Sequence, residues 1–347
     1  MAEFAVVIPT YRRPHLLAAT VESVLRQTYP ASEIVVVRDG PDAAVPESLR
    51  TGSVRVIDRP KEGVAAARNA GTAATHAAWL CFLDDDDLWH PDRLLVTAEY
   101  LDSHTDCAAV QADWWSFAER SLSGIDLVAS DLDQCLAASA HLSASSDGDY
   151  LNITGRSFDL LLGQNRENIL TASIRRDVLV KAGGFPASYT CAEDWVMAIN
   201  VARYTEWHYI NQRLAFRREH AGNNTKVNPT NDLVTIRALR QVWRDTSRPV
   251  PPHRPMEEYA LDYRHLVQTS FWHAMRRCRM RIASEILREG VGLLPRRRDR
   301  LVVGVPPSVN RQFARIRSSA RGPRLSPPEA ASKVRDDEST NNGPASG

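Results

Sequence analysis

Two groups of acidic residues stand out, because carboxylates in such positions can bind a metal ion or move a proton. The first is Asp84, Asp85, Asp86 and Asp87, which directly follow the apolar run 79–83. Four adjacent like charges repel one another, so a folded site needs a counter-charge. Carboxylate oxygens suit Mg²⁺ or Mn²⁺. A solvated acidic turn is the alternative, and the acid run alone does not separate the two.

The second group is Glu193 and Asp194, which open a helical pattern that runs to residue 204. Acids in the first turn of a helix are favoured by the helix dipole, so their presence there needs no functional role. A carboxylate in such a place can also act as a general base and accept the proton of a nucleophile.

The elements that must position these acids alternate between short apolar runs and helical patterns. Strands are predicted at 4–8, 34–37, 54–57 and 79–83, and helices begin near 14, 64 and 91. The runs 4–8 and 79–83 are apolar throughout, as expected of strands buried on both faces. This alternation predicts an α/β fold with a doubly wound, mostly parallel sheet. Such sheets bind ligands at the carboxyl ends of their strands, where the four aspartates would lie.

Other polar side chains are expected at the same edge. Thr10 and Asp39 end two of the predicted strands, and Arg68 lies on the helix after Gly63. A carboxylate at Asp39 can accept a hydrogen bond from a nucleobase, or it can stabilise its own turn with Gly40. Arg68 can reach a base or a phosphate with its fork of donors, or it can be an exposed helical arginine.

The second half of the chain has a weaker pattern. Residues 116–165 are rich in Ser, Ala and Asp and are interpreted as an insertion or acceptor-side loop region. Order is predicted to return at 168–174, followed by a helix at 176–182, a strand at 206–217 and a helix at 231–244. Four prolines fall within 249–255, which predicts a linker, and 256–290 predicts a long helix or helical pair. From 321 onward the composition predicts disorder.

Composition places the chain among globular proteins. It has 347 residues, of which 43% are hydrophobic and 24% charged, so it can bury a sizeable core. The five cysteines are scattered without a Cys-x-x-Cys pair, which argues against a zinc or disulfide framework and favours a reduced cytoplasm. No leader pattern is recognised at the start, and no apolar run approaches the roughly 18 residues of a membrane span.

Charge is unevenly distributed although the net charge is only +1. Residues 276–324 carry 14 arginines, no lysine and three acids. Arg276, Arg277, Arg279 and Arg281 stand among apolar residues, which is typical of a basic helix on an anionic membrane surface. Packing against the acidic body and a solvated helix face are the alternatives. No nucleic-acid-binding motif accompanies the charge, so a nucleic-acid partner is not expected.

Five stretches occur in order along residues 4–220. They are Val-Ile-Pro-Thr-Tyr at 7–11 with 25–29, the run 33–37 with Asp39 and Gly40, the stretch 63–71, the stretch 82–89, and Arg175–Asp177 with 183–185 and 193–195. Together they resemble the family-2 glycosyltransferases of the GT-A fold, which are nucleotide-sugar-dependent enzymes. The resemblance implies a metal-dependent, inverting, single-sugar transfer from a nucleotide-diphosphate sugar to an acceptor that the sequence does not name.

The resemblance also implies roles for individual residues. Asp86 is the expected direct ligand of Mn²⁺ or Mg²⁺, with Asp84 as a second ligand or, like Asp85, facing the ribose or a metal-bound water. His220 is a candidate third metal ligand or phosphate contact, with polar surface as the alternative. The expected nucleotide-sugar contacts are Pro9, Thr10, Tyr11, Arg13, Asp39, Arg68, Asp84 and Asp85. Asp194 is the expected general base, with Glu193 assisting acceptor binding.

The resemblance and the composition of the second half together predict the domain boundaries. A catalytic domain at 1–248 would have a donor half at about 1–112 and an acceptor half at about 113–248. The linker 249–255, an Arg-rich helical region at 256–320 and a disordered tail at 321–347 would follow it.

The sequence departs from the family pattern beside Asp39. Arg38 stands where a second Asp is common, and Pro41 stands where Ser is common and has no backbone donor. These departures leave the nucleobase open. Trp114, Trp115 and Trp195 could stack on a sugar ring or belong to the core.

Two other functions compete with glycosyl transfer as interpretations of these residues. A nucleotidyltransferase could use the same cleft, but 11–14 lacks the Gly-rich, Lys-containing loop that grips phosphates. A non-catalytic nucleotide-sugar-binding module would have no need to keep both acid groups. The Gln-x-x-Arg-Trp motif of processive synthases is absent at 211–215, which favours transfer of one sugar.

Overall fold

Parallel strands form the part of the sheet that comes first in the sequence. The computed structural model describes residues 2–40, 49, 52–118, 131–141, 143–144, 150–219 and 228–306. In it β1 (Phe4–Thr10) pairs in parallel with both β2 (Glu33–Asp39) and β4 (Trp79–Phe82), and β3 (Val54–Arg59) pairs in parallel with β2. The predicted α/β fold with a mostly parallel sheet is therefore confirmed, and the strand ends meet at one edge.

Antiparallel pairing enters the sheet with the strands that follow. Strand β8 (Ser173–Arg175) runs antiparallel to both β4 and β6 (Ala109–Ala118), while β6 pairs in parallel with β9 (Trp207–Glu219). The short strands β5 (Leu88–Trp89) and β7 (Ser143–Ala144) pair antiparallel to β9 and β6. Among the described residues the order is β3-β2-β1-β4-β8-β6-β9-β5, with β7 beside β6.

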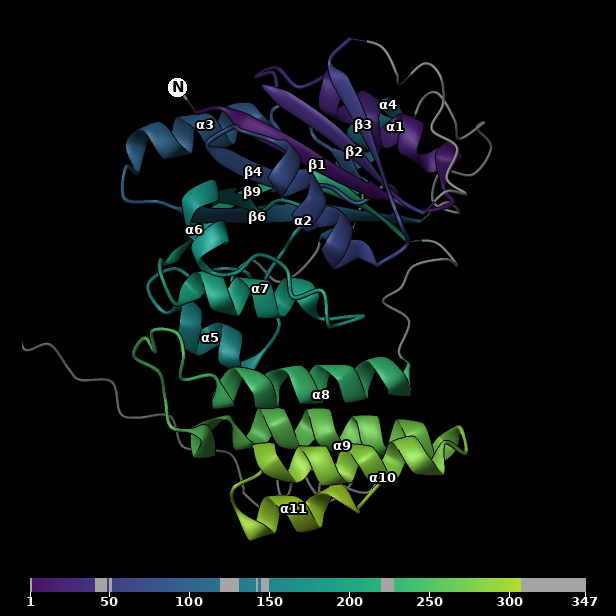
Figure 1. The fold of residues 1–347 in the computed structure, drawn as a ribbon, viewed down its shortest axis with the longest axis vertical. Helices are drawn as coiled ribbons and strands as arrows, with labels where there is room; N and C mark the ends of the chain where they lie inside the picture. The colour runs from purple at the N-terminus through teal and green to yellow at the C-terminus, as the bar shows by residue number, and fades with distance from the viewer. Residues whose placement is uncertain are drawn as a thin grey trace, which may run out of the picture. The chain divides into compact units, whose positions relative to one another are not determined.

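Helices cover both faces of the sheet, as the wholly apolar strands predict. On one face Phe4, Val6 and Ile8 pack with α1 (Pro14–Leu25) and α3 (Arg93–Ser103). On the other face Ala5 and Val7 belong to a larger core. That core includes residues of α2 (Val64–Ala74), α5 (Ser157–Gly163), α6 (Arg176–Lys181) and α7 (Glu193–Ala202), and Figure 1 shows α7 on this side of the sheet.

Helix α2 lies unusually close to the central strand. Gly71 permits this approach, because a Cβ there would come within 2.2 Å of a methyl carbon of Val7. Arg68 lies one turn earlier on the same helix and is 2% exposed. The tight contact between α2 and β1 therefore holds this arginine beneath the edge of the sheet.

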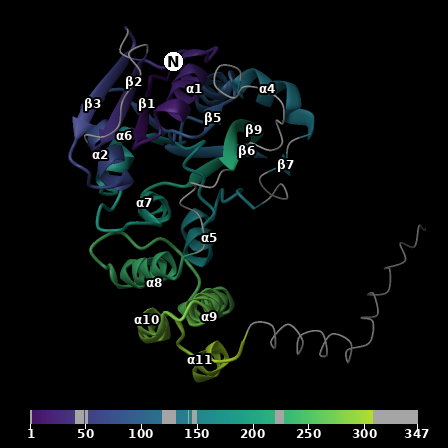
Figure 2. The same cartoon turned by 90° about the vertical axis from the view of Figure 1, so that its right-hand side faces the viewer.

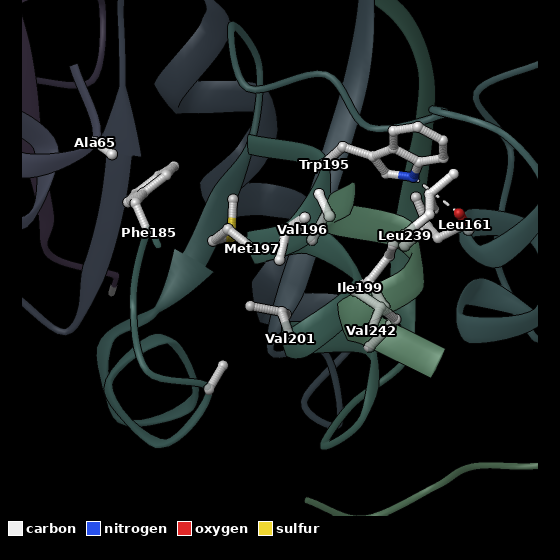
Figure 3. Packing of buried hydrophobic residues seen from close by; sticks show 14 of the residues in the cluster. Ala65, Leu161, Phe185, Trp195, Val196, Met197, Ile199, Val201, Leu239 and Val242 are labelled. Carbon is white, nitrogen blue, oxygen red and sulfur yellow. Dashed lines mark hydrogen bonds between the residues drawn. The ribbon is translucent and has the colours of Figure 1, made fainter. Parts of the chain in front are cut away.

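Helix α7 links the sheet to the helices that follow. Figure 3 shows its side chains Val196, Met197 and Ile199 in the core, with Leu239 and Val242 of α8 (Pro229–Arg244) nearby. Trp195 is buried and donates its indole N–H to the carbonyl of Leu161 at 2.8 Å. Of the two readings of Trp195, the structure places it in the core.

The C-terminal helices pack beyond α8, as Figures 1 and 2 show. They are α9 (Ala260–Arg276), α10 (Met280–Gly290) and α11 (Arg297–Val303), with single 3₁₀ turns at Met256–Tyr259 and Val291–Leu293. Residues Met1–Val305 form one compact unit. The predicted helical pair at 256–290 corresponds to α9 and α10, and the predicted tail at 321–347 lies outside the described residues.

The proline-rich segment 249–255 is held against the rest of the chain. Arg203 donates to the carbonyl of Pro249 at 2.9 Å, and the backbone N–H of Arg254 donates to Asp159 at 3.0 Å. The hydroxyl of Tyr259 also donates to Asp159. Burial opposes ionisation of Asp159, but these donors prevail and hold its pKa well below the usual value. The predicted domain boundaries at 112/113 and 248/249 remain predictions.

Several apolar residues among the C-terminal arginines face inward. Phe271 and Met275 pack against the larger core, and the indole of Trp272 donates to the carbonyl of Val303 at 3.1 Å. The side chains left exposed at the turn between α9 and α10 are Arg276, Arg277, Cys278, Arg279, Met280 and Arg281. The apolar side of this stretch is therefore used for packing within the chain. Across the described residues, no helix is both long and apolar enough to cross a membrane.

Two regions of the sequence prediction gain detail from the structure. In the ordered stretch at 168–174, residues 168–172 form turns before β8, because the carbonyl of Asn168 accepts from the N–H groups of Thr171 and Ala172. Within 116–165, read as an irregular insertion, β6 continues to Ala118 and two helices form, α4 (Asp131–Ala138) and α5. Local periodicity is weak in these short elements, so their tertiary contacts decide the structure.

Candidate active site

The aspartate run forms a turn between β4 and β5, and each aspartate has its own polar partners. Asp85 is buried and accepts from the Thr10 hydroxyl at 2.7 Å, the Tyr11 N–H at 3.3 Å and the Arg13 guanidinium at 3.2 Å. Burial raises the pKa of Asp85 to about 6 despite the hydrogen bond from Thr10. Asp85 therefore ties the end of β1 to the turn.

Asp86 and Asp87 connect the same turn to other elements. Asp86 accepts from Arg13 at 2.5 Å, and its side chain is 12% exposed. Asp87 accepts from the backbone N–H of Arg218 at 2.8 Å, and the Arg218 guanidinium donates to the carbonyl of Asp86 at 2.9 Å. Burial, with Asp86 and Asp84 nearby, raises the pKa of Asp87 well above its usual value. These contacts bring the end of β9 against the turn. His220, the predicted third metal ligand, lies outside the described residues.

Arg68 connects Asp84 to the second acid group, Glu193 and Asp194. One terminal nitrogen of the Arg68 guanidinium donates to Asp84 at 2.7 Å, and the other donates to Glu193 at 2.9 Å. Burial alone would lower the pKa of Arg68, but Asp84 and Glu193 raise it. The guanidinium also lies over the Phe185 ring, 5.3 Å from its centroid. The two acid groups found in the sequence are therefore joined by one buried cation.

Asp39 stabilises a neighbouring loop in this structure. Its carboxylate accepts from the backbone N–H of Glu62 at 2.7 Å and from that of Gly63 at 3.0 Å. Gly63 has a φ of 97°, a conformation that favours glycine, and α2 begins at the next residue. Asp39 thus fixes the start of the helix that carries Arg68. Next to it, Arg38 pairs with Asp58 on β3.

The loop after β1 presents cationic and aromatic groups. The Lys61 ammonium lies 4.0 Å from the centre of the Tyr11 ring, and the Arg12 guanidinium lies 5.1 Å from it. Arg12 has a φ of 56°, in the left-handed region that non-glycine residues seldom adopt. Pro9 is buried within β1. The predicted contacts Pro9, Thr10, Tyr11 and Arg13 therefore lie together beside Asp85.

Asp194 lies at the first turn of α7, next to Glu193. Its Oδ1 accepts from the backbone N–H of Trp195 at 2.7 Å. Ala192, which precedes the helix, has a φ of 59°, so the backbone turns sharply into the acid pair. Burial, with Asp194 adjacent, raises the pKa of Glu193 in spite of Arg68. Asp194 is partly exposed, whereas Glu193 is buried.

The donors of this site fit a hard divalent cation that is also bound by phosphate. Among the described residues, no group of three or more His, Cys, Asp or Glu side chains is placed to hold a metal ion alone. Mg²⁺ and related ions need only one or two carboxylates when substrate phosphates and water complete the shell. Asp84 and Asp86 offer two such carboxylates on one turn, and the Asp84 side chain is 40% exposed. The residues present are therefore suitable for the ion.

Comparison with known proteins shows what the chain resembles. Residues 5–124, about a third of the chain, match the family model described as Glycosyl transferase family 2, a segment that contains β1 and the aspartate turn. An uncharacterized glycosyltransferase of Rickettsia bellii is 23% identical over 232 residues, which are 66% of this chain and 30% of that protein. The chain thus spans less than a third of that relative. An uncharacterized glycosyltransferase of Haemophilus influenzae is 21% identical over 272 residues, which are 77% of this chain and 85% of that protein.

Two solved structures with bound nucleotide sugars are similar in fold to this chain. S. aureus TarS 1-349, in complex with UDP-GlcNAc, has a TM-score of 0.52 at 15% identity, and the match covers 90% of this chain and 79% of that one. The mannosyltransferase PcManGT from Pyrobaculum calidifontis, in complex with GDP-Man and Mn²⁺, has a TM-score of 0.52 at 16% identity, covering 92% and 81%. At this identity the likeness establishes the GT-A-like fold alone.

One acid near this site is not indicated by the sequence. Glu167, in the turn before β8, has a buried carboxyl oxygen, and burial first and then Asp194 raise its pKa well above the ordinary value. Its neighbours Arg166 and Asn168 give no periodic or motif signal that could point to it.

Replacement of Arg68 by methionine should strongly destabilise the fold. The variant keeps an unbranched, buried side chain but leaves Asp84 and Glu193 without their cation, which typically costs about 3–5 kcal/mol. Chemical denaturation of the full chain measures the free energy of unfolding. Because the freed carboxylates can take up protons in the folded state, the loss should be smaller at about pH 5 than at about pH 8.

Arg26→Met is the matched control for this measurement. Arg26 forms an exposed ion pair with Asp133, so its loss should change the free energy of unfolding by less than about 1 kcal/mol. An Arg68→Met variant that is as stable as this control would show that the buried arginine is not needed to join the two acid groups.

Proposed function

We propose that this chain is a metal-dependent, inverting glycosyltransferase that moves one sugar from a nucleotide-diphosphate sugar to an acceptor hydroxyl. The observation that carries the proposal is the Arg68 guanidinium, which joins the aspartate turn to the Glu193–Asp194 pair. A transferase must hold the leaving diphosphate and the base for the acceptor at a fixed separation. One buried cation that contacts both acid groups meets that requirement.

The donor is proposed to bind along the carboxyl edge of β1, β2 and β4. Pro9, Thr10, Tyr11 and Arg13 would contact the nucleotide, with Asp39, Arg68, Asp84 and Asp85 shaping the same pocket. Asp86 and Asp84, with His220 as a third candidate, would hold Mn²⁺ or Mg²⁺. The bound ion would stabilise the charge that develops on the leaving diphosphate. Support comes from the two fold relatives, one solved with UDP-GlcNAc and the other with GDP-Man and Mn²⁺.

Asp194 is proposed to act as the general base. It would take the proton of the acceptor hydroxyl while the acceptor oxygen forms a bond to the anomeric carbon. The bond from that carbon to the diphosphate oxygen breaks on the opposite face, so the configuration inverts. Glu193 would assist in binding the acceptor while its own position is held by Arg68. The partial exposure of Asp194 leaves it open to an acceptor.

Donor binding is the direct test of this function. UDP-GlcNAc or GDP-mannose with Mn²⁺ should raise the melting temperature of the full chain, since a ligand at 100 times its Kd contributes about 2.7 kcal/mol of stability. Asp86→Ala should remove the metal-dependent part of this rise and lower transfer about 100-fold or more. Undiminished activity in EDTA would contradict the metal role, and Asp92→Ala, on the neighbouring helix cap, is the control.

Asp194→Asn should separate donor binding from transfer. The amide cannot accept the proton, so the rate should fall by about 10² to 10⁴ while the donor-induced rise in melting temperature persists. Asp177→Asn, at an exposed ion pair in the first turn of α6, should leave both properties unchanged. Transfer at the wild-type rate by Asp194→Asn would assign the base to another group.

We further propose that the protein is cytoplasmic and touches the anionic inner face of a membrane through the turn between α9 and α10. Arg276, Arg277, Arg279 and Arg281 are exposed there, and the apolar Met280 is 60% exposed between them. Each arginine near an anionic surface contributes about 1 kcal/mol of attraction, which falls off within a Debye length. The wide spread of the cysteines, free throughout the described residues, supports a reducing compartment.

Vesicle sedimentation tests this contact. The full chain should pellet with phosphatidylserine-containing vesicles at low salt and be released at about 0.5 M salt, because the attraction is electrostatic. Replacing the four arginines by glutamine should abolish pelleting, whereas Arg55→Gln, at an exposed position on β3, should not. Equal pelleting with pure phosphatidylcholine vesicles, or none at low salt, would contradict the proposal.

A further inference from the structure

Arg13 stands at the start of α1, where its backbone is fixed. Its carbonyl accepts from the backbone N–H groups of Leu16 and Leu17, each at 3.1 Å, and Pro14 opens the helix directly after it. Proline at the first helical position has a backbone conformation that suits the start of a helix. These contacts involve only the backbone of Arg13. Its guanidinium can therefore change partners by rotation of the side chain, while β1 and α1 stay in place.

One terminal nitrogen of Arg13 contacts two carboxylates of the aspartate turn at once. It lies 2.5 Å from Oδ2 of Asp86 and 3.2 Å from Oδ1 of Asp85. Asp85 also accepts from the Thr10 hydroxyl and the Tyr11 N–H, so it keeps these donors if the guanidinium turns away. Asp86 is the carboxylate that Arg13 approaches more closely, and it is also the proposed direct ligand of the divalent ion. An internal cation therefore binds the carboxylate that the ion would need.

The two arginines at the aspartate turn differ in how firmly they are enclosed. The Arg68 side chain is 3% exposed, and its guanidinium joins Asp84 to Glu193. The Arg13 side chain is 24% exposed, and the Asp86 side chain that it contacts is 12% exposed. Moving a buried charge away from its partners leaves those partners buried and unpaired, which is strongly unfavourable. Arg68 is therefore a permanent part of the site, whereas Arg13 borders on solvent and can be exchanged.

A divalent cation and the Arg13 guanidinium compete for Asp86. Both need the carboxylate oxygens, and two cations held side by side in a partly buried place repel one another strongly. By linkage, the Arg13 contact weakens binding of the ion by the same factor by which the ion weakens the contact. A diphosphate changes this balance. Its oxygens accept paired hydrogen bonds from a guanidinium, and they also complete the shell of the ion.

We propose that Arg13 is an exchangeable counter-ion of the aspartate turn, which holds Asp86 until a divalent cation displaces it and which then binds the diphosphate of the donor. The exchange couples the two ligands, so that the ion and the nucleotide each bind more tightly when the other is present. Without a nucleotide, Arg13 weakens binding of the ion. The inference rests on the proposed function for the identity of the site, but it concerns binding alone and not the transfer step.

Binding of Mn²⁺ alone to the full chain tests the competition, with free Mn²⁺ measured by electron paramagnetic resonance. Arg13→Met keeps an unbranched side chain and removes the charge, so Mn²⁺ should bind about 10-fold more tightly than to wild type, as is typical of coupled sites. Arg13→Lys keeps a cation, so its affinity should stay within about 3-fold of wild type. Arg26→Met, which removes an equal charge from an exposed pair with Asp133, is the matched control and should bind Mn²⁺ as wild type does.

Two outcomes of this measurement would overturn the proposal. The first is an Arg13→Met variant that binds Mn²⁺ no more tightly than wild type, and the second is an equal gain in Arg13→Lys. Arg13→Gln is neutral and keeps a hydrogen-bond donor, so it should show the same gain if the methionine variant does not fold. Adding Asp86→Ala to either neutral variant should remove the gain, because the competition takes place at that carboxylate.

UDP and GDP provide the test of coupling. In wild type, the nucleotide that binds should strengthen Mn²⁺ binding by a larger factor than in Arg13→Met. The variant has no competing cation to displace and no guanidinium to offer the diphosphate. An equal factor in the two proteins would contradict the exchange.

Sugar transfer separates this inference from the proposed function. Tighter Mn²⁺ binding by Arg13→Met, in a chain that transfers no sugar from any nucleotide, would uphold the counter-ion and refute the proposed function. Mn²⁺-dependent transfer by wild type, with no gain of Mn²⁺ affinity in Arg13→Met, would refute the counter-ion and leave the proposed function standing.

Discussion

A single guanidinium, that of Arg68, sets the geometry on which the site depends. It is buried under the edge of the sheet and contacts Asp84 on one side and Glu193 on the other. An unpaired charge in such a position would be strongly unfavourable, so each partner needs the other two. The surrounding fold serves this contact, since Gly71 lets α2 approach β1 and Asp39 fixes the loop from which α2 starts.

The same logic explains how four aspartates can stand side by side. Asp84 pairs with Arg68, Asp85 with Thr10 and Arg13, Asp86 with Arg13, and Asp87 with the backbone of Arg218. The partners come from β1, the loop after it, α2 and β9, which are far apart in the sequence. The four aspartates therefore connect separate parts of the fold through their hydrogen-bond partners. These partners offset the mutual repulsion of the adjacent carboxylates.

The fold could be predicted from the sequence because the apolar patterns that indicate its strands and helices are local. Strands buried on both faces must be apolar throughout, so β1 and β4 were visible, as were the helices that follow them. Short α5 and the turn at 168–172 were not, because their structures depend on contacts with β6 and α7. The acids were also visible as charged residues at strand and helix ends. Which atoms they contact was not visible, so the Arg68 contacts with Asp84 and Glu193 could not be predicted from spacing.

Charge balance connects this architecture to chemistry. Around Arg68 lie Asp84, Glu193 and Asp194, so carboxyl groups outnumber this cation. A nucleotide diphosphate would bring further negative charge to this edge, and a low local dielectric makes such repulsion severe. On the proposed function, diphosphate binding would therefore need an added cation between the phosphates and the aspartate turn. Carboxylates repel a phosphate when no cation is present. If a metal ion lay between them, the carboxylates and the phosphate would both bind that ion, so an acid-rich site is suited to a phosphate that carries a divalent ion.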